Sequence, residues 1–378
     1  MDQLTLGVIA ATRKENERRL PIHPEHLDRI DAGVASRIYL ERGYGSDFGV
    51  SDEQLERHVA GVRSRAELIA DCDVILLAKP EAADLAELRD GQILWGWPHC
   101  VQDRDITQEA IDRKLTLVAF EAMNLWSSDG AFKLHVFHKN NEMAGYCSVL
   151  HALELIGSTG TYGRRMRAAV IGFGATSRGA VTGLHAIGVQ DVDVLTNRSV
   201  AEVASPIHAA NILQFESGDD GVSIVQTDDG KQPLTDFLAE HDIVVNCVLQ
   251  DPNSPLIFLD EDDLGAFRPG SLIVDVSCDE GMGFSWATPT SFNSPSFVVG
   301  DNITYYAVDH SPSYLWNAAT WEISEALIPY LETVLGGAEA WDGDSTISRA
   351  LEIRDGVIQN RDILEFQNRA EEYPHPAR

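Results

Sequence analysis

The chain has 378 residues, of which 44% are hydrophobic and 23% charged, and its formal net charge is −30. This length is sufficient for two packed domains, and the composition excludes a disordered chain and a membrane-spanning protein. The 59 acidic residues against 29 basic ones argue against nucleic acid or an anionic membrane as a partner.

Five cysteines are scattered along the chain without a C-x-x-C pair. Their odd number and their spacing favour a reducing compartment and argue against a zinc site, so we expect no bound metal. The chain does not open with a charged segment followed by an apolar one, and no apolar run is long enough to cross a bilayer. These features predict a cytoplasmic protein.

The first third of the chain alternates short apolar runs with stretches of helical spacing. The runs are rich in Val, Ile, Leu and Trp, which is typical of buried strands. This alternation predicts a parallel sheet wound with helices. The expected strands are residues 4–10, 36–40, 73–78, 92–97 and 115–120, and the expected helices are residues 24–32, 52–62, 65–70 and 105–113.

Four polar residues follow expected strands of this sheet, namely Arg19, Lys79, His99 and Glu121. In an open parallel sheet ligands bind at the carboxyl ends of the strands, so these positions are candidates for a site. Lys79 and His99 are separated by one strand-helix-strand unit, which predicts that they lie on neighbouring strand ends. A cation beside an imidazole suits a substrate with a carboxylate and a proton-transfer step, because histidine titrates near neutrality.

Each of these residues also has a purely structural interpretation. Lys79 fits a solvated charge, His99 fits a structural histidine whose hydrogen bonds are satisfied, and Arg19 fits a surface cation. The sequence leaves both interpretations open for each residue, but the three together indicate a site more strongly than any one of them alone.

A βαβ unit typical of nucleotide binding lies near the middle of the chain. Its first strand, near residues 168–171, runs into a glycine-rich turn and then into a helix. The glycines allow a sharp turn and let backbone N–H groups approach a pyrophosphate at the helix N-terminus. Ser177 stands where the usual spacing has a third glycine, and Gly179 follows two residues later. The expected cofactor contacts in this turn are Gly172, Phe173, Gly174, Thr176 and Ser177.

The second strand of the unit ends in Asn197-Arg198-Ser199. Sites that accept a ribose 2′-hydroxyl usually carry Asp or Glu at this tip, whereas these side chains offer hydrogen-bond donors and a positive charge. The tip therefore favours a 2′-phosphate and predicts NADP, with NAD as the less favoured cofactor. The plainer interpretation is an ordinary strand, turn and helix with a solvated Arg198.

The central domain continues through expected strands at residues 242–248 and 271–276. Asp279 follows the second of these strands and is a candidate for the same site, although it also fits a turn or a helix cap. Cys247 and Leu249, around the end of the first, are also expected to contact the cofactor.

The last part of the chain begins with a helix-start signal, Ser311-Pro312-Ser313, followed by an amphipathic helix to about residue 335. A helix of this length returns the chain to the first domain. We therefore expect an α/β protein of two Rossmann-like, doubly wound lobes with a cleft between them. Residues 1–141 and 306–378 form the substrate lobe, residues 142–305 form the dinucleotide-binding lobe, and residues 373–378 are a frayed end.

Six segments in chain order carry a family resemblance. They are NERRLPIHPEH (16–26), ERGYG (41–45), GWPH (96–99), NEMAG (141–145), GFGATSRGA (172–180) and YAVDHSPS (306–313). With these segments the chain resembles the superfamily of alanine dehydrogenase, saccharopine dehydrogenase and N5-(carboxyethyl)ornithine synthase. The SRGA and VDHSP segments and the NADP-like Arg198 are most similar to the carboxyethylornithine synthase branch.

The resemblance implies roles for individual residues. Arg19 would hold a substrate carboxylate, Lys79 would contact the substrate and assist proton transfer, and His99 would act as acid and base. Asp279 matches the position of a catalytic aspartate in alanine dehydrogenases. Asn141 stands where those enzymes often have a Ser near the pyrophosphate, so it is an expected cofactor contact.

The resemblance also implies reductive amination, in which a 2-oxo acid and an amine form an imine that NADPH reduces. We expect an NADPH-dependent oxidoreductase acting on a CH–NH bond and joining a pyruvate-like acid to the amino group of an amino acid. Candidates for anchoring a larger amine are Arg18, Asp309 and His310.

Other functions stay open at this point. An alanine dehydrogenase that uses ammonia is the main alternative, and a non-catalytic NADP-binding regulatory protein is another. A transhydrogenase subunit is disfavoured because the second strand lacks an acidic tip. The partners are small molecules, and the family analogy implies a homo-oligomer.

Overall fold

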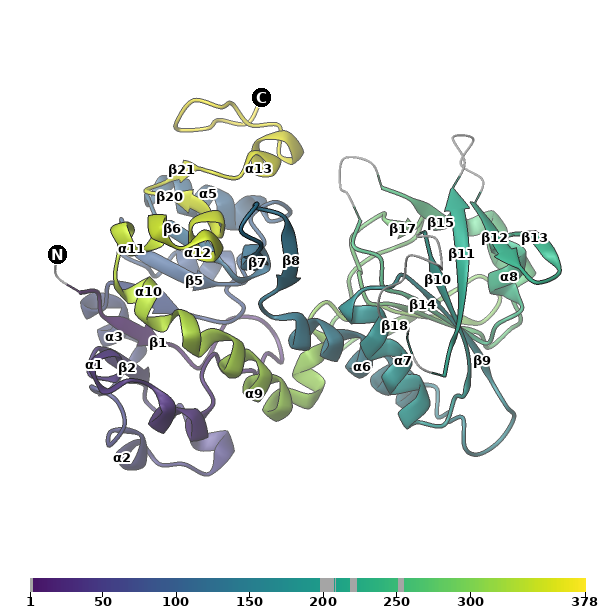
Figure 1. The fold of residues 1–378 in the computed structure, drawn as a ribbon, viewed down its shortest axis with the longest axis horizontal. Coiled ribbons are helices and arrows are strands. Elements are labelled where there is room, and N and C mark those ends of the chain that lie inside the picture. The colour runs from purple at the N-terminus through teal and green to yellow at the C-terminus, as the bar shows by residue number, and fades with distance from the viewer. Residues whose placement is uncertain (1–2, 198–206, 208, 218–222, 251–254) are drawn as a thin grey trace. The chain divides into compact units, whose positions relative to one another are not determined.

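The computed structural model describes residues 3–197, 207, 209–217, 223–250 and 255–378. The chain divides into two compact units (Figure 1). Unit 1 consists of Met1–His138 and Trp316–Arg378, and unit 2 consists of Lys139–Leu315. Unit 1 is therefore built from two separate segments of the chain.

Unit 1 contains an eight-stranded sheet in the order β21-β20-β6-β5-β4-β1-β2-β3. Strands β1 to β6 are parallel to their neighbours, while β20 and β21 join one edge in antiparallel orientation. The strands are β1 (Leu6–Val8), β2 (Ile38–Glu41), β3 (Gly61–Arg63), β4 (Val74–Leu76), β5 (Ile93–Gly96), β6 (Thr116–Ala119), β20 (Leu351–Arg354) and β21 (Val357–Ile358). A separate hairpin is formed by β7 (Asn124–Trp126) and β8 (Phe132–His135).

Helices cover both faces of this sheet. Alternate strand residues point to opposite faces, so Leu76 packs in one core with residues of α9 and α10, and Ile75 packs in another with residues of α3 and α5. The helices are η1 (Pro24–Arg29), α1 (Ala32–Ala35), η2 (Ser46–Phe48), α2 (Asp52–Leu55), α3 (Arg65–Asp71), α4 (Ala82–Leu85), α5 (Arg104–Asp112), η3 (Phe120–Ala122), α9 (Trp316–Leu327), η7 (Ile328–Tyr330), α10 (Leu331–Leu335), α11 (Ala338–Gly343), α12 (Ser345–Arg349) and α13 (Arg361–Phe366).

Unit 2 contains a nine-stranded sheet in the order β13-β12-β11-β10-β9-β14-β16-β19-β18. Its six central strands are parallel, and numbered in chain order they run 3-2-1-4-5-6, the order of a Rossmann fold. The expected fold class, two doubly wound α/β units of which the first is discontinuous, is confirmed. The strands are β9 (Arg167–Ile171), β10 (Asp191–Thr196), β11 (Asn211–Ser217), β12 (Ser223–Thr227), β13 (Gly230–Pro233), β14 (Ile243–Asn246), β16 (Leu272–Asp275), β18 (Ser296–Val299) and β19 (Ile303–Tyr306).

Helices also cover both faces of the second sheet, and two hydrophobic cores lie against it. A small second sheet pairs β15 (Ile257–Leu259) with β17 (Gly283–Phe284). The helices are α6 (His138–Leu155), α7 (Ala175–Ala186), α8 (Leu234–Ala239), η5 (Glu261–Ala266) and η6 (Ser311–Leu315).

Three expectations about local structure are wrong. The helix expected over residues 52–62 ends at Leu55, and its last residues form β3, which completes the edge of the sheet beside β2. The single helix expected to run to residue 335 is interrupted at η7, because Pro329 lacks the N–H needed to continue α9. The end of the chain is not frayed, since the buried His375 accepts a hydrogen bond from the backbone N–H of Ile358 at 3.1 Å.

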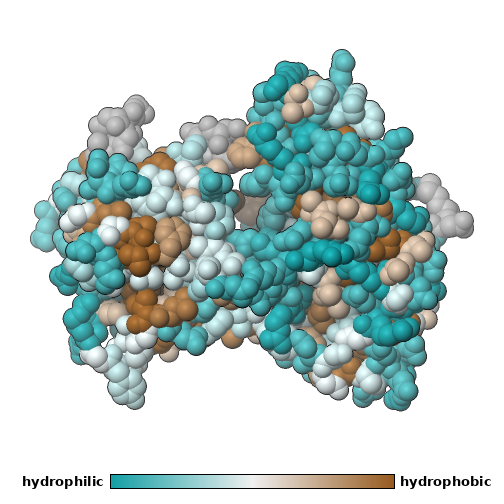
Figure 2. Space-filling model, turned by 180° about the vertical axis from the view of Figure 1, so that it is seen from behind, coloured by the Kyte–Doolittle hydropathy of each residue, from teal (hydrophilic) through white to brown (hydrophobic). Residues whose placement is uncertain are grey.

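The face drawn in Figure 2 is covered largely by hydrophilic residues, with smaller hydrophobic patches between them. This surface is consistent with the large negative charge of the chain. All five cysteines are buried and free. Within the described residues, no helix combines the length and the apolar character that crossing a membrane requires.

Candidate functional site

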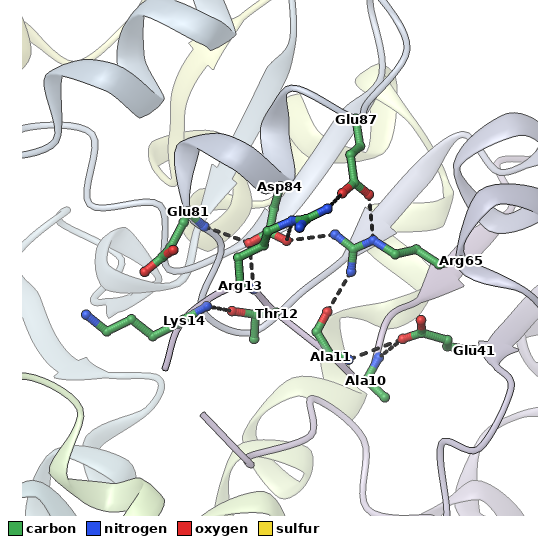
Figure 3. A network of polar contacts seen from close by, with 10 residues as sticks. All are labelled: Ala10, Ala11, Thr12, Arg13, Lys14, Glu41, Arg65, Glu81, Asp84 and Glu87. Carbon is green, nitrogen blue, oxygen red and sulfur yellow. Dashed lines mark hydrogen bonds and ion pairs between the residues drawn. The ribbon is translucent and has the colours of Figure 1, made fainter. Parts of the chain in front are cut away.

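The loop that follows β1 is held in place by charged side chains from neighbouring elements (Figure 3). Glu41, at the end of β2, accepts hydrogen bonds from the backbone N–H groups of Ala10 at 2.8 Å and Ala11 at 3.2 Å. Arg65, at the start of α3, donates to the carbonyl oxygen of Ala11 at 2.6 Å. The path of this loop is therefore fixed before it reaches the two arginines at positions 18 and 19.

Asp84 connects this loop to the turn after β4. Its side chain is only 1% exposed and accepts hydrogen bonds from Arg65 at 2.7 Å, from the backbone N–H of Arg13 at 3.2 Å and from the backbone N–H of Glu81 at 2.9 Å. One buried carboxylate thus holds together two segments that carry candidate residues, because Lys79 lies two residues before Glu81.

Arg19 is a buried cation of unit 1, with a side chain 4% exposed. Its Nε donates to Oε1 of Glu17 at 2.8 Å, and Glu17 also accepts the backbone N–H of Arg19 at 2.9 Å. The guanidinium carbon lies 5.3 Å from the ring centre of Trp97, which follows β5. The surface interpretation of Arg19 is therefore wrong, because this guanidinium is buried and held in a fixed orientation.

Arg18 lies in a different environment. Its Nη2 donates to Asp47 at 2.9 Å, and its guanidinium carbon lies 4.4 Å from the ring centre of Trp316. The side chain is about half exposed, at 49%. The structure thus gives Arg18 and Arg19 different ion-pair partners, Asp47 and Glu17.

Lys79, His99 and Glu121 follow three neighbouring strands, β4, β5 and β6. Hydrogen bonding between the first two strands continues past their ends, because the N–H of Trp97 donates to the carbonyl of Ala78 at 2.9 Å. The backbone N–H of His99 then donates to Oε1 of Glu121 at 2.6 Å. The three residues therefore share one corner of the sheet, which we call the strand-end corner.

His99 has the backbone conformation φ = +49°, which is uncommon for a residue other than glycine. Such a conformation persists where surrounding contacts impose it, and it is found often at functional sites. The imidazole is 42% exposed, and its Nδ1 lies 4.0 Å from Oε1 of Glu121. The imidazole of His99 is therefore partly accessible.

Glu121 has an environment that keeps its carboxyl group protonated at neutral pH. Burial raises its pKa to about 8, assisted by repulsion from the buried Glu352, although backbone N–H groups and the charge of Lys79 act in the opposite direction. Its Oε2 is buried and has no hydrogen-bond partner among the described residues. A perturbed carboxyl beside a half-exposed imidazole is the kind of pair that moves protons in enzymes.

The turn after β9 has the backbone features of a phosphate-binding turn. Gly172 adopts φ = +114°, a region that side chains exclude. A Cβ placed on Gly174 would meet no described atom within 4 Å, so open space lies beside the backbone where α7 begins. Phe173 and Thr176 are partly buried around this turn, and the guanidinium of Arg178 lies 5.1 Å from the centre of the Phe173 ring.

Close contact between α6 and α7 explains the unusual spacing of this motif. A Cβ on Gly179 would lie 1.6 Å from the carbonyl oxygen of Glu142, and one on Gly145 would lie 2.0 Å from the carbonyl of Thr176. Gly179 thus provides a close backbone approach between two helices, while Ser177 is fully buried beneath the turn. The departure from the usual pattern reflects packing against α6.

The other expected cofactor contacts are only partly described. Asn197 is exposed after β10, but Arg198 and Ser199 lie outside the described residues. Cys247 is buried directly after β14, and Leu249, two residues later, is 90% exposed. An apolar side chain with this exposure next to a strand end is available to contact a ligand.

Asp279 lies in the loop after β16, which a buried carboxylate organises. Asp275, fully buried, accepts hydrogen bonds from Tyr305 at 2.7 Å, from Asn246 at 2.9 Å and from the backbone N–H of Cys278 at 3.1 Å. The adjoining Asp279 is partly buried, and this burial raises the pKa of its carboxyl. Asp275 thus anchors the loop at Cys278, the residue directly before Asp279.

Asp309 and His310 pair with each other. The distance from Nδ1 of His310 to Oδ1 of Asp309 is 2.6 Å, and the ring of His310 also contacts Phe292 edge-on with centres 4.9 Å apart. His310 is 2% exposed, whereas the side chain of Asp309 is 25% exposed. Of this pair Asp309 is the one with an accessible side chain. Asn141 is partly buried in the first turn of α6.

Sequence reasoning named Glu121 as a candidate at a strand end but gave it no chemical role. It missed two carboxylates that organise unit 1, Glu17 and Asp84. These two carried no signal in the sequence, because their partners are set by loop geometry. Among the described residues no group of His, Cys, Asp and Glu is arranged to hold a metal ion.

Comparison with known proteins identifies relatives along most of the chain. The family description "Alanine dehydrogenase/PNT, N-terminal domain" matches residues 7–144, and "Alanine dehydrogenase/PNT, C-terminal domain" matches residues 156–361. An N(5)-(carboxyethyl)ornithine synthase of Clostridium botulinum is 26% identical over 324 residues, covering 82% of this chain and 89% of the relative.

An alanine dehydrogenase of Halomonas elongata is 25% identical over 375 residues, covering 93% of this chain and 94% of the relative. Among solved structures, an L-alanine dehydrogenase matches with a TM-score of 0.75 at 20% identity, covering 96% of this chain and 99% of that one. At this identity the structural match shows the shared fold. The homologues are oxidoreductases.

Proposed function

We propose that this chain, which belongs to the alanine dehydrogenase/PNT family, is an NADPH-dependent oxidoreductase acting on CH–NH bonds. In this proposal it joins a pyruvate-like 2-oxo acid to the amino group of an amino acid by reductive condensation. The observation that carries the proposal is the strand-end corner, where Lys79, His99 and Glu121 follow adjacent parallel strands.

The turn after β9 fits a dinucleotide. The positive φ of Gly172 and the open space beside Gly174 leave room for a pyrophosphate against the first backbone N–H groups of α7. We assign Gly172, Gly174 and Thr176 to the pyrophosphate, with the exposed Leu249 as an apolar contact. When bound, the nicotinamide would supply the hydride.

The residues of unit 1 would handle the substrate and its protons. Arg19, oriented by Glu17, would hold the carboxylate of the oxo acid. Lys79 or His99 in its protonated form would donate a proton to the hydroxyl that leaves as the imine forms, and the neutral partner would accept the proton of the amine. Glu121, which accepts the backbone N–H of His99 at 2.6 Å, would hold the turn that carries the imidazole.

Substitution of the corner residues tests this proposal. Lys79→Met and His99→Ala should each abolish NADPH oxidation in the presence of oxo acid and amine, while the affinity for NADPH stays nearly unchanged. Lys133→Met is a matched control, because Lys133 is an exposed lysine on β8. Full turnover by either corner variant would remove that residue from the catalytic assignment.

The choice of NADPH rests on the tip of the second Rossmann strand. Arg198→Asp should weaken NADPH binding by loss of charge-assisted hydrogen bonds, each contributing about 1.5–3 kcal/mol. Titration of both cofactors by fluorescence measures this. Equal use of NADH and NADPH by the unaltered protein would contradict the assignment.

A second candidate function is alanine dehydrogenase activity, with ammonia as the amine. It is supported by coverage, because the Halomonas elongata alanine dehydrogenase aligns with 93% of this chain and the carboxyethylornithine synthase with 82%. A panel of pyruvate or 2-oxoglutarate with ammonia or individual amino acids separates the two. Tight NADPH binding without oxidation by any pair would instead favour a regulatory protein.

A further inference from the structure

The C-terminal segment, residues 359–378, is part of unit 1, and the family match ends within it at residue 361. Hydrogen bonds between its own backbone groups hold the segment together, such as that from the N–H of Ala370 to the carbonyl of Pro376 at 2.9 Å. Its buried side chains include Gln367, 1% exposed, and Arg369, 8% exposed. Two buried polar side chains at the end of a chain need a structural or functional reason.

Gln367 contacts the turn that carries His99. Its Nε2 donates to the carbonyl of Cys100 at 2.7 Å, and it also lies 3.2 Å from both the carbonyl of Val101 and Oγ1 of Thr107. The carbonyl of Cys100 belongs to the residue directly after His99. The side chain of Gln367 therefore fixes the turn from a position 267 residues away along the chain.

Arg369 determines which way the amide of Gln367 points. Its Nε donates to Oε1 of Gln367 at 2.6 Å, which leaves the NH₂ group facing the carbonyls of the turn. Arg369 is itself held by Oε1 of Gln108 on α5 at 2.8 Å and by the carbonyl of His375 at 3.2 Å. The orientation of the Gln367 amide thus depends on the contacts that hold Arg369 within the C-terminal segment and against α5.

The turn of His99 is held from two directions. On the side of the sheet, Glu121 accepts the N–H of His99 at 2.6 Å. Within the turn, the carbonyl of His99 accepts the N–H groups of Gln102 at 3.1 Å and Asp103 at 2.9 Å. Gln367 holds the carbonyl of the next residue, Cys100, so contacts from two distant segments fix the backbone at His99 and Cys100.

We infer that Gln367, oriented by Arg369, is a positioning residue that holds the His99 turn in its working conformation. The C-terminal segment thereby sets the direction of the imidazole in unit 1. This inference rests on the proposed role of His99 and extends it to residues that the family match does not reach. An error of about 1 Å in the position of a catalytic group costs up to about 10²-fold in rate.

Gln367→Met tests the inference in the full-length protein, because methionine keeps the length of the side chain and removes the amide. Gln359→Met is the matched control, since Gln359 is an exposed glutamine of the same segment whose amide donates locally to the carbonyl of Val357 at 2.9 Å. Circular dichroism establishes that each variant is folded. Arg369→Lys is a milder second variant that keeps the charge and removes the hydrogen bond from Nε.

Two measurements are made on each variant. Hydrogen exchange without substrate should show the amides of Gln102 and Asp103 exchanging about tenfold faster in Gln367→Met than in the unaltered protein. Steady-state kinetics should show kcat reduced about tenfold with the KM for NADPH within twofold. Arg369→Lys should move both readouts in the same direction, by about threefold, and Gln359→Met should move neither.

The two proposals fail in different ways. Full kcat in Gln367→Met alongside an active unaltered protein overturns the positioning role and leaves the proposed function intact. An unaltered protein without turnover overturns the proposed function, while the exchange of Gln102 and Asp103 still tests the contact. Unchanged exchange in both folded variants overturns the inference outright.

Discussion

The strand-end corner of unit 1 and the turn after β9 in unit 2 occupy equivalent places, since both follow parallel strands of a doubly wound sheet. The corner is organised by acidic side chains that are buried or partly buried, with Asp84 and Glu121 accepting backbone N–H groups. The turn is organised by the absence of side chains at Gly172, Gly174 and Gly179. The strand-end corner depends on electrostatic interactions and hydrogen bonds. The turn after β9 depends on the space that the missing side chains leave.

This difference determines how each site responds to change. A buried carboxylate holds its partners through electrostatic interactions that depend on pH and on every partner being present. A close backbone approach at a glycine depends only on whether the Cβ of a larger residue would fit between the two segments. Substitutions at charged positions should therefore affect unit 1, and substitutions that add volume should affect unit 2.

The largest effect is expected for Asp84→Ala, which leaves Nη2 of Arg65 and two backbone N–H groups without their acceptor. Removing one partner of a buried charge pair costs about 3–5 kcal/mol of unfolding free energy. Urea unfolding measures this loss, and hydrogen exchange should increase around residues 10–14 and 79–85. Asp90→Ala is the control, because Asp90 is 81% exposed and its pairing with Arg113 is long, at 3.7 Å. A loss below about 1 kcal/mol for Asp84→Ala would show that the network does not hold the corner.

Gly179→Ala is expected to have the next largest effect, and to act on unit 2. Its Cβ would lie 1.6 Å from the carbonyl oxygen of Glu142, so α6 and α7 must move apart. Overpacking of this kind costs about 3 kcal/mol, which thermal denaturation should register. Gly174→Ala, at the N-cap of α7 in the same turn, should cost less, about 1 kcal/mol, while weakening cofactor binding. Equal stability losses in the two variants would contradict the packing explanation.

The smallest effect is expected for Glu121→Gln and concerns pH. The pKa of Glu121 is raised to about 8 by burial, so between its unfolded pKa near 4.5 and pH 8 the folded chain binds more protons than the unfolded one. Stability from this group therefore falls as pH rises, by about 2 kcal/mol between pH 6 and pH 8. Urea unfolding at both pH values should show a smaller fall in Glu121→Gln. Identical pH dependence in both proteins would exclude a protonated Glu121.

The boundaries of the two units were harder to predict than their fold. The sequence placed the junctions after residues 141 and 305, whereas the contacts divide the chain after residues 138 and 315. The pattern of apolar runs identifies strands well, because their alternation repeats locally. The pattern does not show that η6, which follows β19, still belongs to unit 2, or that the chain returns to unit 1 only at α9. That division depends on which residues each segment contacts.

The sequence alone determined the features that arise from neighbouring residues, namely the parallel strands, the glycine-rich turn after β9 and the placing of Lys79 and His99 at strand ends. Only the tertiary structure decided how those residues are held. Glu121, Asp84 and Gln367 contact His99, Arg13 and Cys100 across 22, 71 and 267 residues of chain. Their effect comes from burial and from hydrogen bonds between distant segments, and neither quantity exists until the chain has folded.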